Sequence, residues 1–384
     1  MSTNEKIDRE LRIKTELYKA YFDCRRNKRN THNALAFEIQ MEQNLDLLYR
    51  QIMDGSYVPG KSVVFIVTKP VVREIFAADF RDRVIHHFII NRVVAYLERM
   101  FIYDSYSCRK DKGTLFGIKR VEHFMRACSQ NYRKDCFILK LDIQGFFMHI
   151  DRKRLLQKIN AVIEKYCCNE DKKLMYDLCE KVILQNPIDN CITKGSFDEW
   201  EKLPKNKSLF HVPKGCGLPI GNLTSQLFAN LYLNDFDHFV KRKLKAKYYG
   251  RYVDDMVLFD HSKKKLLEWR DSIKEYLENS LELSTHPSKE YLQHFSKGVT
   301  FLGAHIMPYR TYIGRRTLNN FNRLVVGREW TGEIDLITGQ GLEPRTKRVK
   351  SYLGLMKHFK THNIITKFEA NSRTDRNIHF LYDY

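Results

Sequence analysis

The chain has 384 residues, of which 43% are hydrophobic and 29% charged, so a disordered protein is excluded and two or three folded modules are expected. Its 66 Lys and Arg outnumber its 46 Asp and Glu, and the resulting net charge of +20 favours a polyanionic partner over a generic basic protein. The nine cysteines form no Cys-X-X-Cys pair, and no signal peptide or membrane-length apolar run is present, which predicts a soluble, cytoplasmic protein with no membrane contact.

The first part of the chain alternates helical and extended patterns. Residues 5–53 place apolar side chains mostly at helical spacing, interrupted by the basic stretch CRRNKRN at 24–30. DGSYVPG at 54–60 predicts a turn, and two β-rich runs then lead to a predicted helix at Phe80–Phe101. CFILKLDI at 136–143 is a compact apolar run that predicts a buried strand.

The second part repeats the alternation. Residues 152–185 are predicted to be helical, and residues 186–217, rich in Pro, Asn, Lys and Gly, are predicted to form a loop. A long amphipathic helix is expected after position 221, and YYGRY and MVLFD are two short strands on either side of a pair of aspartates. GVTFLGAHIM at 298–307 is β-rich, and the basic tail from about 315 contains helical runs.

Three aspartates stand next to predicted strands. Asp142 ends an apolar strand, and Asp254 and Asp255 are adjacent, so each ionised carboxylate raises the pKa of the other unless a cation lies between them. Most bare Asp-Asp pairs are simply polar turns. Here the turn has no glycine at its apex and carries Val253 instead, which indicates a constrained turn kept for chemistry. A divalent ion, with magnesium preferred for its oxygen ligands, would stabilise all three carboxylates.

These residues resemble characteristic blocks of reverse transcriptases. The stretch Tyr252-Val253-Asp254-Asp255 resembles the family's YxDD box, and LDIQGFF at 141–147 resembles its first carboxylate block. Three further blocks occur in the family's order, at Arg73–His87, at SYSCRKDKGT (105–114) and at PSKEYLQHFSKGVTFLG (287–303). The resemblance covers roughly residues 20 to 310, and five blocks in sequence are far more specific than any one of them.

The resemblance implies the fold class and its division. We expect an α+β right-hand polymerase, with an antiparallel palm sheet packed on helices and a small helical thumb. The implied domains are an N-terminal helical segment at 1–60, fingers and palm at 61–308, and a helical thumb with a basic C-terminal tail at 309–384.

The resemblance also implies the catalytic groups. Asp142 and Asp254 would bridge two Mg²⁺ ions, for which Mn²⁺ can substitute, with Asp255 assisting and the carbonyl of Ile143 as an extra ligand. Lys289 is a candidate for protonating or orienting the leaving pyrophosphate.

Three further residues concern the incoming nucleotide. Phe147, five residues after Asp142, would be the steric gate that excludes a ribose 2′-hydroxyl, whereas Phe146 is assigned to the core; plain core packing is the alternative for both. Lys69 and Arg73 resemble the fingers residues that hold the triphosphate, and a solvated basic face is the alternative for them.

The block GLPIGNLTSQ at 217–226 narrows the resemblance. Most bacterial reverse transcriptases begin this block with Gln-Gly and end it with Ser-Pro, whereas this chain has Ile220 and Gln226. The form IGNLTSQ resembles the reverse transcriptases of diversity-generating retroelements, as do EWEKLPKNKSLF at 199–210 and SYLGLMKHFKTHN at 351–363.

The same block contains the template and fidelity candidates Ile220, Asn222 and Gln226 and the nucleotide-binding candidate Gly221. Gly221 permits a close backbone approach to the nascent base pair or template. Asn222, with Thr224 and Ser225, is expected to cap the following helix, and capping alone would explain these residues. An aliphatic side chain at Ile220 cannot make the hydrogen bonds of a Gln, so base selection is expected to loosen.

The resemblance implies an RNA-directed DNA polymerase that makes error-prone cDNA, with misincorporation opposite template adenine. Its implied partners are template RNA, the cDNA/RNA hybrid, dNTPs and a small, basic, pentameric accessory variability protein. Two alternatives remain open: a group II intron or retron enzyme, and a reverse-transcriptase-like defence polymerase with untemplated synthesis.

Overall fold

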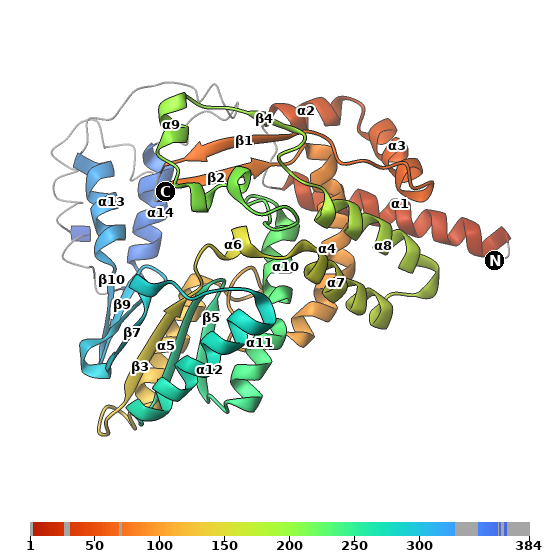
Figure 1. Cartoon of the computed structure of the whole chain (residues 1–384). Helices are drawn as coiled ribbons and strands as arrows, with labels where there is room; N and C mark the ends of the chain where they lie inside the picture. Colours follow the sequence, from red (N-terminus) through yellow and green to blue (C-terminus); the bar gives the residue numbers. More distant parts are fainter. Residues whose placement is uncertain are drawn as a thin grey trace. The chain divides into compact units, whose positions relative to one another are not determined.

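In the computed structural model, the chain forms two compact units that interleave along the sequence (Figure 1). The structure describes residues 3–26, 31–68, 71–326, 345–359, 361 and 365–366. The first unit comprises Met1–Arg109, Ile143–Leu244 and Lys274–Thr285, and the second comprises Lys110–Asp142, Lys245–Ile273 and His286–Tyr384.

The first unit is mainly helical. Its longer helices are α1 (Thr3–Arg25), α2 (His32–Ile39), α3 (Met41–Met53), α4 (Phe80–Met100), α7 (Arg152–Tyr166), α8 (Asn169–Leu184) and α10 (Leu223–Tyr232). Helix α4 begins where the Asp79 side chain accepts a hydrogen bond from the amide of Arg81, and α1, α7, α8 and α10 pack against it. The helices predicted at 5–53 and Phe80–Phe101 are confirmed for the described residues, where the first stretch is divided into α1, α2 and α3.

A small sheet completes the first unit. Strand β1 (Ser62–Val67) pairs antiparallel with β2 (Arg73–Ala77) and parallel with β4 (Cys191–Thr193). The prediction of a loop at 186–217 is wrong in part, because this stretch contains β4, the helix α9 (Phe197–Glu201) and two 3-10 turns, Lys205–Lys207 and Leu209–His211.

Two predicted helical stretches are interrupted. The stretch 152–185 is divided between α7 and α8 because Cys168 has an extended backbone, with φ −65° and ψ 147°. The long helix expected after position 221 ends at Tyr232, because Leu233 leaves helical geometry, with ψ near 3°. A short helix, α11 (Asn234–His238), and a π-helical turn at Phe239–Lys243 follow.

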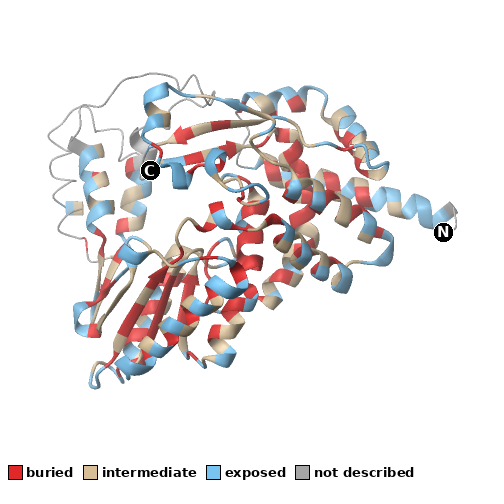
Figure 2. Cartoon of the chain, in the orientation of Figure 1, coloured by how far each residue is buried: buried red, intermediate tan, exposed pale blue. Residues whose placement is uncertain are grey.

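The second unit contains a four-stranded antiparallel sheet in the order β5-β6-β3-β7. Its strands are β3 (Phe137–Asp142), β5 (Tyr248–Tyr252), β6 (Asp255–Asp260) and β7 (Tyr291–His294). Helix α5 (Thr114–Cys128) packs on this sheet, with the ring of Phe124 5.8 Å from that of Tyr248 and 6.2 Å from that of Phe259. Figure 2 shows that the central strands β3 and β6 are largely buried, whereas β7 on the other side of β3 is half-buried. The antiparallel sheet on helices expected for the palm is therefore present.

Helix α12 (Lys263–Leu281) follows β6. Its N-terminal part belongs to the second unit and its C-terminal part to the first. The remaining elements of the second unit follow β7. Strands β8 (Val299–Phe301), β9 (Ala304–Met307) and β10 (Arg310–Ile313) form a second antiparallel sheet. Helices α13 (Arg315–Val326) and α14 (Arg345–Met356) share a small core built on Ile313, Phe321, Val349 and Met356.

The division at 1–60, 61–308 and 309–384 stays a prediction. Within the described residues, no helix is both long and apolar enough to span a membrane.

Candidate active site

The three predicted aspartates lie at one end of the four-stranded sheet. Asp142 is the last residue of β3 and Asp255 is the first residue of β6, and the two are Cα partners in the antiparallel ladder. Asp254 directly precedes Asp255 in the turn between β5 and β6. Because antiparallel partners lie about 4.5–5.5 Å apart, the fold brings together carboxylates that are more than a hundred positions apart in sequence.

The turn that carries the aspartate pair is strained, as its sequence indicated. Val253 has a φ of 57°, in the left-handed region that β-branched residues avoid. Arg251, which is fully buried, donates a hydrogen bond of 2.9 Å from its guanidinium to the carbonyl oxygen of Val253. Arg251 was not among the residues predicted from the sequence, although a lone arginine inside the apolar strand YYGRY was an available signal.

Two lysines face the carboxylates. Lys289 Nζ lies 2.8 Å from Asp142 Oδ1, which places this predicted residue beside the predicted acid. Lys140 Nζ lies 3.1 Å from Asp255 Oδ1. Lys140 was not predicted either, although it is the single cation in the buried strand FILKLD, and an unpaired charge in such a strand is costly.

Burial changes the ionisation of Asp255. Desolvation raises the pKa of this carboxyl to about 7; the charge of Lys140 opposes the rise, whereas Asp254 and Asp142 add to it.

The three aspartates supply the oxygen ligands that a divalent cation prefers, but their side-chain positions do not form a metal site. Among the described residues, no group of three or more His, Cys, Asp or Glu side chains is arranged closely enough to hold a metal ion. Asp142 and Asp255 instead face lysines. The backbone register and the oxygen ligands suit magnesium, which the carboxylates would bind after turning away from the lysines. Ile143, the next residue after Asp142, is buried and forms an isolated bridge with Thr285.

The steric-gate candidate lies in the first unit. Phe146 and Phe147 are the first two residues of the short helix α6 (Phe146–His149). Gly145 is the N-cap residue of this helix and has a φ of 55°. Phe146 is buried and Phe147 is half-buried, which matches the core role expected of the first and leaves the second accessible. Phe147 packs against a core cluster formed by Val64, Phe76, Met148 and Leu209.

Ile220 packs against the same cluster, so the candidates for sugar selection and base selection share one set of core contacts. The carbonyl of Ile220 also accepts a 2.8 Å hydrogen bond from the amide of Phe76. At Gly221, with a φ of 125°, a Cβ atom would lie 2.5 Å from the carbonyl oxygen of Phe76. A glycine is therefore required at 221 by a close approach to strand β2.

The capping expected of the 222–225 stretch is wrong. Asn222 occupies the N-cap position of α10, but its side chain makes no capping hydrogen bond. Its Oδ1 is buried without a hydrogen-bond partner among the described residues. Thr224 and Ser225 are buried inside the helix. The exposed Gln226 accepts a hydrogen bond of 3.0 Å from the thiol of Cys108, in the block at 105–114.

Of the two triphosphate-binding candidates, Arg73 belongs to the described part of the chain. Arg73 is the exposed first residue of β2 and pairs with Val67 of β1. Lys69 lies outside the described residues.

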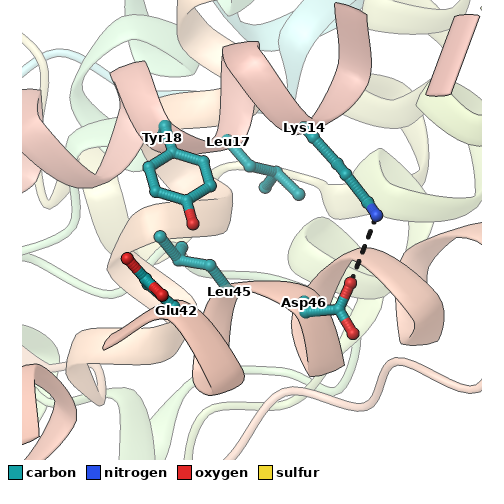
Figure 3. A pocket seen from close by; sticks show the side chains of 6 residues that line it. All are labelled: Lys14, Leu17, Tyr18, Glu42, Leu45 and Asp46. Carbon is teal, nitrogen blue, oxygen red and sulfur yellow. Dashed lines mark ion pairs between the residues drawn. The ribbon is translucent and has the colours of Figure 1, made fainter. Parts of the chain in front are cut away.

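A pocket of about 220 Å³ lies between α1 and α3 and contains none of the predicted residues (Figure 3). It is lined by Lys14, Leu17, Tyr18, Glu42, Leu45 and Asp46. Lys14 pairs with Asp46 across it at 3.3 Å, and this ion pair accounts for two of its polar groups.

Comparisons with known proteins match most of the chain. The family model described as "Reverse transcriptase (RNA-dependent DNA polymerase)" matches residues 69–306, which is more than half of the chain. Protein YkfC of Escherichia coli (strain K12) is 21% identical over 316 residues, which cover 73% of this chain and 76% of that protein.

Solved telomerase structures are also similar. Apo telomerase from Candida tropicalis matches with a TM-score of 0.51 and 12% identity over 83% of this chain and 60% of that chain. Telomerase from Candida albicans in complex with a TWJ fragment of telomeric RNA matches with a TM-score of 0.48 and 12% identity, covering 84% of this chain and 58% of that one. The chain thus spans less than two-thirds of the length of these telomerases. The first of these likenesses, with the family match, confirms the predicted α+β fold of right-hand polymerases.

Proposed function

Because the chain belongs to the reverse transcriptase family, we propose that it is the RNA-directed DNA polymerase of a diversity-generating retroelement, which makes error-prone cDNA from an RNA template. One observation carries the polymerase activity. Asp142 and Asp255 are direct partners across β3 and β6, and a strained turn held by Arg251 places Asp254 beside them. A positive φ at a valine is costly, and such strain is typical of functional turns.

In this proposal Asp142 and Asp254 hold two Mg²⁺ ions, Asp255 assists, and the carbonyl of Ile143 is a further ligand. When bound, the ions would activate the primer hydroxyl and stabilise the leaving pyrophosphate. Lys289, which pairs with Asp142 at 2.8 Å, would orient the leaving pyrophosphate. Mn²⁺ has similar ligand preferences and would substitute.

Apart from Lys289, the proposed nucleotide-binding residues belong to the first unit. The exposed Arg73 would hold the triphosphate, together with Lys69 four positions earlier in the sequence, since a guanidinium contacts phosphate oxygens in a bidentate manner. The accessible ring of Phe147 would exclude a 2′-hydroxyl, and Gly221 would keep the start of α10 close to β2 beside the nucleotide.

The retroelement assignment rests on the block at 217–226. Ile220 presents an aliphatic side chain where most bacterial relatives have a Gln, and Gln226 replaces a Pro. The buried and unpartnered Oδ1 of Asn222, between these two residues, supports a role in template contact because such an atom favours a hydrogen-bond donor from a ligand. With Ile220, base selection opposite template adenine would be loose.

The partners follow from charge. A net charge of +20 would attract template RNA and the cDNA/RNA hybrid. A basic pentameric accessory variability protein is proposed from the family resemblance alone.

Primer extension on a defined RNA template, with magnesium and all four dNTPs, tests the proposal when the products are sequenced. Errors concentrated opposite adenine are expected. Faithful cDNA would instead favour a group II intron or retron enzyme. Products independent of the template would favour a defence polymerase with untemplated synthesis. Absence of any product, with and without an accessory protein, would contradict polymerase activity.

A further inference from the structure

The segment 202–214, between α9 and α10 in the first unit, is a concentrated positive surface. Its sequence KLPKNKSLFHVPK contains four lysines and no acidic residue. The side chains of Lys202, Lys205, Lys207 and Lys214 are all exposed. None of the four forms an ion pair with a carboxylate of the described residues. The fold therefore leaves this charge available to a partner.

Core contacts fix the segment in place. Leu209 is 2% exposed and belongs to the cluster that includes Phe76. Its amide donates a hydrogen bond of 3.3 Å to Oε1 of the buried Glu74. Gly217 makes room for it, since a Cβ there would lie 2.5 Å from a methyl carbon of Leu209. An anchored segment loses little conformational entropy when it binds a partner.

The same segment contains an accessible aromatic ring, that of Phe210. Phe210 is 40% exposed, and its ring lies 5.8 Å from that of Trp200 and 6.3 Å from that of Phe76. These two contacts support the ring from inside and leave part of it open to solvent. A supported, accessible aromatic ring in a segment rich in exposed lysines suits a single-stranded nucleic acid, because phosphates pair with the cations and bases stack on the ring.

The segment borders the candidate steric gate. A Cβ on Gly145 would lie 3.6 Å from the carbonyl oxygen of Asn206, so the turn at Lys205–Lys207 lies against the residue that precedes α6. Leu209 and Phe147 pack in the same cluster. Figure 1 draws the connection between α9 and α10 beside the β1–β2 hairpin, in agreement with these contacts. A strand held here would be continuous with the nucleotide-binding residues of the same unit.

We propose that the segment 202–214 binds a single-stranded stretch of the template RNA, with Lys205 and Lys207 on its phosphates and Phe210 stacked on a base. The inference rests on the proposed function, because it takes the template RNA as the strand. A duplex fits less well, since its bases are already stacked and offer no free face to the ring. A surface that serves only solubility would show no preference between the two.

The test measures binding without dNTPs, so its result does not depend on catalysis. The probes are an RNA–DNA hybrid with a 5′ single-stranded RNA extension of about ten nucleotides, the same hybrid with blunt ends, and the hybrid with a DNA extension. Lys205→Ala/Lys207→Ala is expected to weaken binding of the RNA-extended hybrid and leave the blunt hybrid unchanged. Loss of two phosphate contacts on a single strand should make the dependence of log affinity on log salt shallower by about 1.4.

Two variants sharpen the result. Lys19→Ala/Lys173→Ala removes two exposed lysines of the same unit, from α1 and α8, and should change neither affinity. Phe210→Leu keeps an apolar side chain against Trp200 but removes the aromatic face, and should weaken binding of the RNA-extended hybrid about tenfold without changing the salt dependence.

Equal losses for blunt and extended hybrids, or no loss for either, would overturn the proposal. A loss confined to the DNA extension would assign the segment to the product strand and also overturn it. If the wild-type chain binds the RNA extension as described but makes no cDNA, the proposed function fails while this surface stands. If it makes cDNA and Lys205→Ala/Lys207→Ala binds normally, the reverse holds.

Discussion

The buried guanidinium of Arg251 hydrogen-bonds the carbonyl oxygen of Val253 at 2.9 Å, and so holds a left-handed valine directly before the aspartate pair. An L-residue costs about 1–2 kcal/mol in this conformation. The turn therefore trades stability for a fixed position of Asp254 and Asp255.

Val253→Gly should separate stability from activity. Glycine removes the strain but increases the entropy of the unfolded chain by about 0.5–1 kcal/mol, so the free energy of unfolding should rise by up to about 1 kcal/mol. Nucleotide addition should fall at least about tenfold, because the carboxylates lose their fixed position. Denaturant unfolding and primer extension measure the two effects.

Leu302→Gly is the matched control, because Leu302 also has a positive φ, 51°, in the turn between β8 and β9. It should gain similar stability and keep full activity. Full activity in Val253→Gly would show that the strained turn has no role in catalysis.

Asp254→Asn should abolish nucleotide addition while leaving RNA affinity nearly unchanged, because phosphate contacts come from Lys and Arg. Asp260→Asn is the control on the same hairpin: Asp260 ends β6, caps the amide of Ser262 at 2.9 Å and pairs with Lys265 at 3.0 Å. It should retain activity. An equal fall in RNA binding by Asp254→Asn would argue against a metal-binding role.

Phe147→Ala should admit ribonucleotides, raising the ratio of rNTP to dNTP incorporation roughly tenfold or more by removing the ring that excludes the 2′-hydroxyl. Phe147→Tyr keeps the ring and should keep the selectivity. Single-nucleotide incorporation kinetics give both ratios, and an unaltered ratio in Phe147→Ala would remove this residue as the gate.

Ile220→Gln should lower misincorporation opposite template adenine, because it restores a side chain that can hydrogen-bond near the base pair. Ile188→Gln makes the same substitution at another half-buried residue on the same core cluster, so it should cost comparable stability and leave the error spectrum unchanged. Sequencing of cDNA from both variants measures misincorporation opposite template adenine. Equal error spectra in the two variants would rule out a role for Ile220 in base selection.

His86 should make stability depend on pH. Burial, aided by the charges of His87 and Arg83, lowers the pKa of this imidazole from 6.5 to about 3. Between pH 6.5 and 3 the unfolded state binds the extra proton and the folded state does not, so stability falls as the pH falls, by at most about 1.4 kcal/mol per unit.

His86→Leu should flatten that dependence, measured by denaturant unfolding at several pH values. His32→Leu changes an exposed histidine and should leave the dependence as in the wild type. If His86→Leu keeps the full slope, the acid sensitivity comes from other groups.

Local chemistry made the three aspartates predictable. Acidic residues beside apolar strands are costly without a cation, and a turn with Val253 in place of a glycine indicates strain by its residue types alone. Lys140 and Arg251 were harder to find. Their roles depend on which carboxylate or carbonyl faces them across strands distant in sequence, and side-chain pattern alone does not determine that partner.

The capping stretch shows the opposite case. Asn222 does occupy the N-cap position that its residue type favours, yet it makes no cap because the chain before it is pulled against Phe76 and its side chain is buried. Likewise, residues 186–217 have the composition of a loop, but Cys191–Thr193 becomes a strand by pairing with β1. In both places a long-range contact overrides a local preference.

Residue types and short spacings are enough to predict the family, the strands and helices with strong periodicity, and the three candidate aspartates. The pairing of Asp142 with Asp255, the contacts of both with lysines, and the core cluster shared by Phe147, Ile220 and Leu209 appear only in the folded chain. Register and packing arise from contacts between segments far apart in the chain, where the free energy of the whole fold selects among many locally acceptable pairings.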